Sequence, residues 1–409
     1  MHHHQLSCGM TLLGQNMPWL RSAAFALVLP AGCQYESRAR RGVAGMVCEM
    51  VQRGAGSRSS RQIVAESDNL GLDRSSSVTT AHTSYGAAMP TESLDEALRL
   101  YTDIVRRPHL PGDQLEDARS VSLQELRANE DEPAQRVMIR LKERHYGDDL
   151  GHSPQGTLAG LQAVTASDVR EFFEAHYTPR GATLAIAGNF DWERTVDLVE
   201  QLFEGWPQAP EVPPPAAAGT PGYEHIEHPS QQTHIGFSFP AWSYDHPDYF
   251  TLRAAVGVLS DGMSSRLFDR VREQRGLCYT VSAGTHSMRG VGGVFGYAGT
   301  TAERAQETLD VTLAEIDKLG ATVEEDELDR FKVRIHSQLI MQQESSSSRA
   351  AAMASDWYFL RRLLTPEEIE AAIDAVTPAK IAALWDQLPK NQYRIVTLGP
   401  KPLQVNGSR

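Results

Sequence analysis

The sequence contains little cysteine. Its 409 residues include four, Cys8, Cys33, Cys48 and Cys278, and no two of them have Cys-x-x-Cys spacing. So few cysteines in a chain of this length exclude a disulfide scaffold. The spacing indicates neither a structural zinc site nor a thioredoxin-type motif. Cys48 lies on an otherwise apolar helical stripe, where we interpret it as a small hydrophobic residue.

Long apolar runs are missing as well. The best apolar stretch near the N-terminus is Ala23–Pro30 (AAFALVLP), which is too short to span a bilayer and predicts a buried strand. It also lacks the basic start and the small-residue cleavage site of a signal peptide. We therefore expect a cytoplasmic protein that contacts no membrane. The histidine run at positions 2–4 is given no role.

The chain has fewer basic residues than acidic ones. Lys and Arg number 39 against 52 Asp and Glu, which gives a net charge of −13. An acidic surface repels phosphate backbones, so the composition argues against a nucleic-acid partner. Such a surface attracts basic peptides, although solubility alone is sufficient reason for the charge.

Proline gathers in one segment, residues 207–222 (PQAPEVPPPAAAGTPG). Because prolines are incompatible with a helix interior and with a central strand, we expect this segment to be an exposed, semi-rigid connector. It leaves a domain of normal size on each side, at residues 1–206 and 223–409.

The two halves are alike in pattern. Ser93–Leu126 and Arg304–Leu339 each read as an amphipathic helix, a turn, and a second long helix with an acidic start. This similarity predicts an internal duplication. Four strands are also predicted, at Ala23–Pro30, Ala182–Asn189, His234–Phe239 and Tyr393–Gly399. Because strands and helices mix without a regular alternation, we expect α+β halves, each with a mostly antiparallel sheet.

Residues 42–55 read GVAGMVCEMVQRGA. The frame resembles the G-x-A-H-x-x-E-H-M-x-x-x-G-[TA] helix of the inverted zinc peptidases, peptidase family M16, which includes insulinase and the mitochondrial processing peptidase. Gly45 stands at the first zinc histidine, Cys48 at the catalytic glutamate and Glu49 at the second histidine. The frame itself is held by Gly42, Ala44, Met50, Gly54 and Ala55.

The resemblance extends over nearly the whole chain. It is carried further by residues 108–119 (PHLPGDQLEDAR), 146–157 (YGDDLGHSPQGT), 172–191 (FFEAHYTPRGATLAIAGNFD) and 264–283 (SSRLFDRVREQRGLCYTVSA). It implies the LuxS/MPP-like metallohydrolase fold: two homologous α+β domains, each a mostly antiparallel sheet with helices packed on one side. It points to the bacterial members of about 400 residues.

A catalytic zinc needs three protein ligands and an open position for water. In the family the third ligand is a glutamate 76 residues after the second histidine, and counting from Glu49 this position is Glu125. Moving the frame by one residue would lose this spacing and still supply no histidine. We therefore expect no metal in this chain. Glu125 then reads as a helix residue paired with a nearby arginine, and a peptidase with an altered metal site stays open as an alternative.

The second half keeps another part of the pattern. Arg272 and Tyr279 lie seven residues apart in VREQRGLCYTV. In the family, an arginine and a tyrosine at this spacing reach the zinc site from the second domain. A guanidinium and a phenol are hydrogen-bond donors that can be directed at a developing oxyanion. The sequence also predicts a helix end, a turn at Gly276 and a strand, which would hold Tyr279 on a rigid element.

Bacterial members of the family include heterodimers in which one subunit carries zinc and the other carries the Arg–Tyr pair. The chain resembles the second type. The resemblance thus implies a subunit, inactive alone, that pairs with a zinc-bearing homologue and helps it to cut an extended peptide. The alternatives are a non-catalytic scaffold, like the core subunits of the respiratory cytochrome complex, and a homodimer that binds peptide without cutting it.

Overall fold

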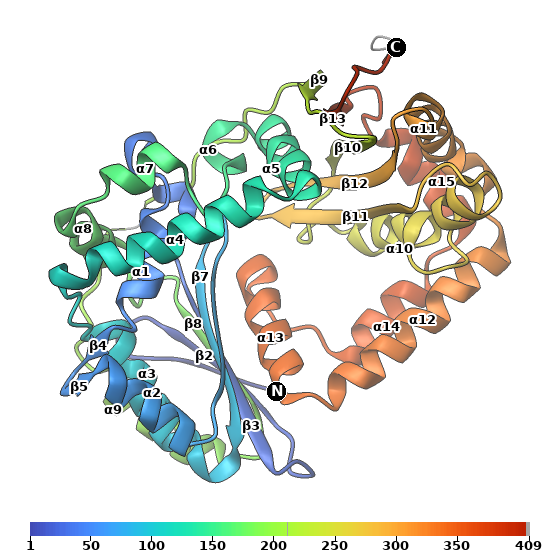
Figure 1. Cartoon of the computed structure of the whole chain (residues 1–409). Coiled ribbons are helices and arrows are strands. Elements are labelled where there is room, and N and C mark those ends of the chain that lie inside the picture. The colour runs from blue at the N-terminus through green and yellow to red at the C-terminus, as the bar shows by residue number, and fades with distance from the viewer. Residues whose placement is uncertain (211, 406–409) are drawn as a thin grey trace. The chain divides into compact units, whose positions relative to one another are not determined.

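The computed structural model describes residues 1–210 and 212–405, which fall into two compact units (Figure 1). The first unit consists of Met1–Ala128, Ser153–Pro215 and Met341–Leu363. The second consists of Asn129–His152, Ala216–Ile340 and the chain from Leu364 onward. Each unit thus takes a segment from the other half of the sequence. The division into domains at residues 1–206 and 223–409, joined by a linker at residues 207–222, stays a prediction.

The first unit is built on a six-stranded sheet in the order β1-β2-β8-β3-β7-β6. Only β2 and β8 pair in parallel. The strands are β1 His2–Gln5, β2 Thr11–Asn16, β3 Ser22–Leu29, β6 Asp73–Val78, β7 Thr83–Pro90 and β8 Thr183–Gly188. The strands predicted at Ala23–Pro30 and Ala182–Asn189 are confirmed as β3 and β8. Every residue of β8 is buried, so both faces of the sheet must be covered there.

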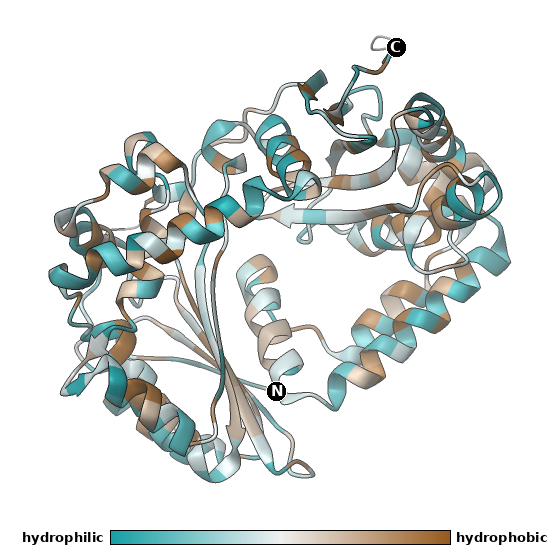
Figure 2. Ribbon diagram, viewed as in Figure 1, coloured by the Kyte–Doolittle hydropathy of each residue, from teal (hydrophilic) through white to brown (hydrophobic). Residues whose placement is uncertain are grey.

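Helices from the first half cover one face of this sheet. They are α1 Val43–Met50, α2 Ser60–Asn69, α3 Leu94–Arg106, α4 Leu115–Glu130, α7 Leu158–Ala163, α8 Ala166–His176 and α9 Trp192–Phe203, with short 3₁₀ turns η1 Cys33–Tyr35, η2 Arg38–Arg40, η3 Thr91–Ser93 and η4 Gly112–Gln114. Brown and teal residues alternate along these helices in Figure 2, as expected where one helix face is buried.

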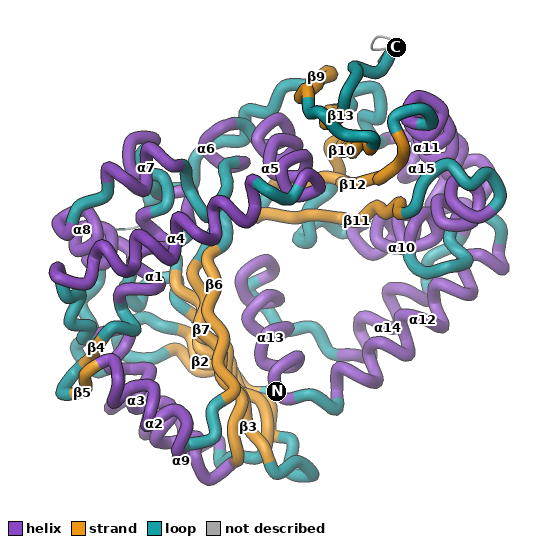
Figure 3. Tube along the Cα trace, in the orientation of Figure 1, coloured by secondary structure: helices purple, strands orange, loops and turns teal. Residues whose placement is uncertain are grey.

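One helix from the second half, α13 (Ser346–Leu360), lies on the opposite face of the first sheet (Figure 3). Small side chains on both sides allow the close approach: Ala185 and Ala187 of β8 pack against Ala350 and Ala354 of α13. The apolar run that predicted β8 is therefore buried on both faces, because a helix distant in sequence completes the second layer.

The second unit has a five-stranded sheet in the order β11-β12-β10-β13-β9, in which only β13 and β9 are parallel. Its strands are β9 Gly222–Glu227, β10 Gln232–Ala241, β11 Thr280–Met288, β12 Val291–Thr301 and β13 Arg394–Gly399. The strands predicted at His234–Phe239 and Tyr393–Gly399 are confirmed as β10 and β13.

Most helices of this unit pack on one face of its sheet. They are α10 Tyr249–Ser260, the π-helical η5 Leu267–Glu273, α11 Ala305–Thr322, α12 Glu325–Gln343, α14 Pro366–Asp374 and α15 Pro378–Gln387. On the other face lie α5 (Pro133–Tyr146) and the short α6 (Asp148–Gly151), which come from the first half. The linker is fastened to α5, since the N–H groups of Ala218 and Thr220 donate to the carbonyl oxygens of Tyr146 and Arg144, at 2.9 Å each.

The predicted helix pairs are confirmed as α3 with α4 and α11 with α12. The predicted fold class, α+β with mostly antiparallel sheets, is confirmed too. One detail differs from the prediction of helices on one side only. Each sheet is also covered on its second face by at least one helix, which comes from the other half of the sequence. Within the described chain, no helix combines the length and the apolar composition needed to cross a bilayer.

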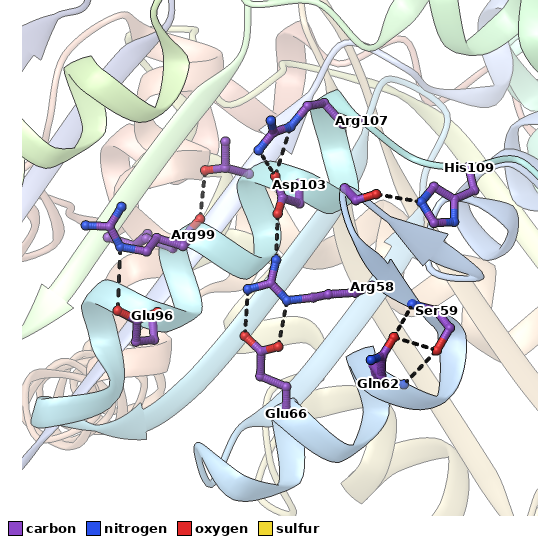
Figure 4. A network of polar contacts seen from close by, with 12 residues as sticks. Arg58, Ser59, Gln62, Glu66, Glu96, Arg99, Asp103, Arg107 and His109 are labelled. Carbon is purple, nitrogen blue, oxygen red and sulfur yellow. Dashed lines mark hydrogen bonds and ion pairs between the residues drawn. The ribbon is translucent and has the colours of Figure 1, made fainter.

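The turn after α1 is fixed by a polar network (Figure 4). Arg58 of the small hairpin β4 Gly54–Ala55 and β5 Arg58–Ser59 donates to Glu66 of α2, at 2.6 and 2.9 Å, and to Asp103 of α3 at 2.6 Å. Arg107 binds the other oxygen of Asp103. These contacts connect the end of the motif helix with the two helices packed beside it.

Candidate functional site

The motif helix α1 is preceded by an N-cap glycine that its backbone requires. Gly42 has φ +105°, a conformation that other residues adopt at a cost. The carboxylate of Glu36 accepts hydrogen bonds from the N–H groups of Gly42 (3.0 Å) and Ala44 (2.8 Å). A negative charge at a helix N-terminus satisfies free N–H groups and opposes the helix dipole. The frame of the motif is thus kept as a well-capped helix.

Gly45, at the position of the first zinc histidine, is not imposed by packing. A Cβ atom there would lie 3.6 Å from the carbonyl oxygen of Pro154, an ordinary contact distance. Glycine inside a helix costs about 1 kcal/mol relative to alanine. The position has room for a side chain but supplies no metal ligand.

Cys48, at the position of the catalytic glutamate, is buried. Burial raises the pKa of its thiol to about 11, against the lowering effect of hydrogen bonds with Tyr85 and Ser76. The carboxylates of Glu49 and Glu125 add to the rise, so both lie close enough to act on the thiol. In the free chain at neutral pH the sulfur is therefore protonated, and a protonated thiol is a poor nucleophile.

Glu49, at the position of the second histidine, is held by an arginine. Its Oε1 atom accepts from Nε and Nη2 of Arg53, one turn further along the chain, at 3.2 and 3.0 Å. Glu125 lies exposed on α4 and, within the described residues, makes no ion pair. The expected pairing of Glu125 with a nearby arginine is therefore wrong.

This donor set does not fit a catalytic zinc. Gly45 offers no ligand atom, the Cys48 thiol is buried and is protonated in the free chain, and the Glu49 carboxylate is bound to Arg53. Across residues 1–210 and 212–405, no three His, Cys, Asp or Glu side chains gather closely enough to hold a metal ion. What α1 provides in place of a metal site is buried packing.

Arg272 is the penultimate residue of the π-helical segment η5. Its guanidinium carbon lies 4.6 Å from the ring centre of Phe268, and its Nε is 3.5 Å from a carboxylate oxygen of Glu273. The side chain is 41% exposed, so both contacts lie at the surface. The predicted turn follows, with Gly276 at φ +59°, and β11 starts at Thr280. The Arg272 guanidinium thus packs against the ring of Phe268 and is still exposed to solvent.

Tyr279 is 48% exposed, just before β11. Its N–H donates to the carbonyl oxygen of Gly299 in β12 at 3.1 Å, and its hydroxyl donates to Oε1 of Gln232 in β10 at 3.1 Å. The ring lies directly over Gly299, where a Cβ atom would come within 2.4 Å of the hydroxyl oxygen. Gly299, which leaves room for the ring, and the amide of Gln232, which accepts from the hydroxyl, therefore fix the direction of the Tyr279 side chain.

A second pair of polar groups stands behind Tyr279. Tyr297 of β12 shares a side-chain hydrogen bond with Tyr279, and its hydroxyl is 2.7 Å from Nδ1 of His234 in β10. Burial raises the pKa of the Tyr297 phenol, and burial lowers the pKa of His234 although Glu132 opposes the shift. Tyr297 and His234 are therefore both neutral near pH 7.

The sequence did not indicate these supporting residues. Gln232 and His234 are two apart on β10, and Tyr297 and Gly299 are two apart on β12, so each pair shares a sheet face. The pairing of β10 with β12 then sets Gln232 opposite Thr301 and His234 opposite Gly299. The sequence shows only that the two residues of each pair are separated by one residue. It does not show that β10 and β12 are neighbours in the sheet.

Two family models match the chain. Residues 12–156 match the model described as insulinase (peptidase family M16), and residues 163–334 match the model described as the peptidase M16 inactive domain. Two uncharacterized zinc proteases are similar over almost the full length. That of Rickettsia bellii is 28% identical over 98% of this chain and 97% of its own, and that of Bacillus subtilis is 26% identical over 96% of each.

Solved structures share the fold. A peptidase M16 inactive domain from Pseudomonas fluorescens aligns with a TM-score of 0.91 at 21% identity, covering 99% of both chains. A protease from Helicobacter pylori aligns at 0.89 with 18% identity, over 98% of this chain and 99% of that one. A chain of Complex III2 from Candida albicans aligns at 0.83 with 16% identity, over 98% of this chain and 96% of that one.

Proposed function

The chain belongs to peptidase family M16, and from that premise we propose that it is a zinc-free subunit that completes the active site of a zinc-bearing homologue. The partner would bind the metal and cut an extended peptide. This chain would contribute Arg272 and Tyr279 in trans. It would be inactive alone, because α1 supplies neither a zinc ligand nor a general base.

One observation carries the proposal: the polar groups of the two motif regions differ in availability. On α1 the Cys48 thiol is buried and protonated and the Glu49 carboxylate is bound by Arg53. On η5 and before β11, a guanidinium and a phenol are both exposed. Exposed donors on well-ordered elements are what a trans-acting site needs.

The chemistry suits these donors. Attack of water on a peptide carbonyl places negative charge on its oxygen, and hydrogen-bond donors directed at that oxygen stabilise the charge. The Tyr279 hydroxyl, which donates to Gln232 in the free chain, would exchange this acceptor for the substrate oxygen. Arg272 would add a positive charge beside the developing oxyanion. The partner's zinc would supply Lewis-acid polarisation of the same peptide group.

The test is reconstitution. The chain is mixed with a homologue that carries an intact His-x-x-Glu-His motif, and cleavage of a fluorogenic peptide is followed. We expect activity only in the mixture, and a loss of about 10²-fold or more in kcat with Tyr279→Phe or Arg272→Ala, as for the removal of one oxyanion donor. Arg275→Ala is the matched control, since Arg275 is exposed three residues away and lies 3.9 Å from Glu307.

Three results would contradict the proposal. If the mixture keeps full activity with both Arg272→Ala and Tyr279→Phe, the chain acts as a scaffold. If the chain alone binds peptide as a homodimer and no zinc-bearing homologue associates with it, its function is binding without cleavage. Stoichiometric zinc in the pure chain together with unaided cleavage would instead return it to the active peptidases.

A further inference from the structure

The Tyr279 hydroxyl belongs to a row of hydrogen-bonded groups on the second sheet. The row runs from Gln232 through Tyr279 and Tyr297 to His234. All four residues lie in the second unit. They come from β10, from β12 and from the residue that precedes β11, so the pairing of the strands brings them together.

Strand register explains the contact between Tyr297 and His234. In the pairing of β10 with β12, His234 lies opposite Gly299 and Tyr297 lies opposite Gly236. The two rings are therefore diagonal neighbours, which large side chains can bridge. Because each ring stands opposite a glycine, the two can lean toward each other. Their centres are 6.1 Å apart, and the Tyr297 hydroxyl is 2.7 Å from Nδ1 of His234.

The number of protons in the row fixes the direction of its hydrogen bonds, because each hydroxyl has one proton to donate. Tyr279 donates its proton to Oε1 of Gln232 at 3.1 Å. In its hydrogen bond with Tyr297 the Tyr279 oxygen therefore accepts, and Tyr297 donates. With that proton used, the Tyr297 oxygen accepts from His234. The donor in this last contact is then Nδ1–H.

The ring of His234 has only one proton to place. Burial lowers the pKa of His234 more than the exposed carboxylate of Glu132 raises it, so the ring is neutral near pH 7. A neutral imidazole carries its proton on Nδ1 or on Nε2, and its hydrogen-bond partners decide which. The protons counted along the row assign it to Nδ1.

We propose that Tyr297 and His234 are positioning residues for Tyr279: Nδ1–H of His234 donates to Tyr297, and the Tyr297 hydroxyl donates to the Tyr279 oxygen. The Tyr279 proton is then left for Gln232 in the free chain and for the substrate oxygen that replaces Gln232. Consecutive hydrogen bonds polarise one another, so the row makes Tyr279 a stronger donor. This catalytic consequence rests on the proposed function, whereas the tautomer of His234 does not.

The tautomer is measured in the free full-length chain. Its histidines are labelled with nitrogen-15, and the ring protons and nitrogens are correlated by NMR at pH 7.5. The signals of His234 are those that His234→Asn lacks. We expect the proton on Nδ1. In Tyr297→Phe the acceptor for this proton is gone, so the Nε2–H form should increase.

The catalytic consequence is measured in the mixture with the zinc-bearing homologue. Tyr297→Phe should lower kcat by about 3- to 10-fold, which is what one ordinary hydrogen bond contributes, and should leave KM unchanged. In a chain that already carries Tyr279→Phe it should cost nothing more, because the oxygen that it serves is absent. His234→Asn keeps an N–H donor near the position of Nδ1 and should be more active than His234→Leu, which has none.

Tyr223→Phe is the matched control. It removes another tyrosine hydroxyl from the same sheet, one that lies 2.8 Å from Oγ1 of Thr397. Tyr223 is on β9, which β13 separates from β10. This variant should change neither kcat nor the tautomer of His234.

Three outcomes would overturn the inference. They are a proton on Nε2 in the unmodified chain, full kcat of Tyr297→Phe in a mixture that Tyr279→Phe impairs, and an effect of Tyr297→Phe on KM alone. If Tyr279→Phe itself costs no activity, the proposed function fails, and the tautomer alone decides whether the row exists. The tautomer is read from the unmodified chain, so misfolding of Tyr297→Phe would leave that test intact.

Discussion

The motif helix α1 and the segment from η5 to β11 are the two regions where the resemblance to the family would place active-site chemistry, and their polar groups differ in exposure. In α1 the cysteine is buried and protonated, and the remaining carboxylate is bound by the arginine one turn away. In the second segment Tyr279 and Arg272 stay exposed, and Gln232, Tyr297 and Gly299 fix the direction of the phenol.

The difference lies in how each region treats its polar groups. Of the three motif positions on α1, only Cys48 is buried, Gly45 has no side chain and Glu49 is paired with Arg53. No packing requirement explains a half-exposed phenol whose supporting residues come from two neighbouring strands. The helix frame survives in α1 because Gly42 and Glu36 serve the backbone rather than the metal.

The largest effect is expected from rebuilding the lost site. The triple substitution Gly45→His, Cys48→Glu and Glu49→His restores the motif residues. The carboxylate of Glu125, which lies close enough to act on the residue at position 48, would be the third ligand. Gly45 has space for a Cβ atom. We expect about one zinc ion per chain in metal analysis after dialysis.

Gly45→His alone is the control for this rebuilding and should hold no zinc through dialysis, because a single added imidazole leaves two ligand positions unfilled. A folded triple variant without zinc would contradict the expectation. It would mean that Glu125 and the restored histidines do not converge, and that α1 has lost the site's geometry as well as its ligands.

A smaller effect is expected from displacing Tyr279 without removing it. In Gly299→Ala the new methyl group would meet the tyrosine ring, so the hydroxyl must move. In the reconstituted enzyme we expect kcat to fall by about tenfold or more, the range seen when a catalytic donor is misplaced. The measurement is kcat with saturating peptide.

Gly284→Ala on β11 is the matched control for Tyr279 displacement, because a Cβ atom there meets nothing within 4 Å. It should keep the activity of the unmodified chain. If Gly299→Ala is as active as the unmodified chain, the partner does not depend on the position of Tyr279. The segment from η5 to β11 would then contribute no more to catalysis than α1 does.

Acid should weaken the sheet that carries Tyr279. Burial lowers the pKa of His145 to about 4, from a usual value near 6.5, and Arg394 adds to the shift. The unfolded chain then binds more protons between these two values, so stability is full above pH 6.5 and falls as the pH drops toward 4. By pH 5 this histidine alone accounts for a loss of about 2 kcal/mol.

Urea unfolding at pH 7.5 and pH 5 measures this loss. His145→Phe should be less stable at pH 7.5, because it gives up the hydrogen bond to Ser238, but should lose less stability on acidification than the unmodified chain. His246→Phe, outside the buried cluster, is the control and should leave the pH difference unchanged. An equal loss in all three proteins would place the acid sensitivity elsewhere.

The smallest effect concerns the scaffold beside α1. Arg58 joins Glu66 and Asp103 in a mostly buried network, so Arg58→Met leaves the carboxylate of Asp103 with Arg107 alone (Figure 4). We expect a loss of about 1–2 kcal/mol in the free energy of unfolding. Arg99→Met, which breaks a pair with Glu96 at 3.5 Å on the surface, should cost less than about 0.5 kcal/mol. Similar losses for both would show that the network adds nothing beyond a surface pair.

Several features could be predicted because they are local. The apolar runs at Ala23–Pro30 and Ala182–Asn189 gave β3 and β8, and the paired amphipathic patterns gave α3 with α4 and α11 with α12. The turn at Gly276 was predictable for the same reason, since the conformation of a turn depends on a few adjacent residues. The missing histidines were visible in the sequence itself.

Other features could not be predicted because they join distant residues. Nothing in the spacing of residues 346–360 says that α13 covers the first sheet, or that α5 covers the second. The expected arginine partner of Glu125 was wrong because an exposed carboxylate on α4 can stay in water at little cost.

The sequence by itself determined that this chain lacks the imidazoles of a zinc site and keeps Arg272 and Tyr279, since residue identity requires no fold. Tertiary structure alone decided that Tyr279 lies on Gly299 and is held by Gln232, and that a helix from the second half of the chain, α13, covers the first sheet. The physical reason is that burial and hydrogen-bond partners arise from strands and helices brought together from far apart in the chain.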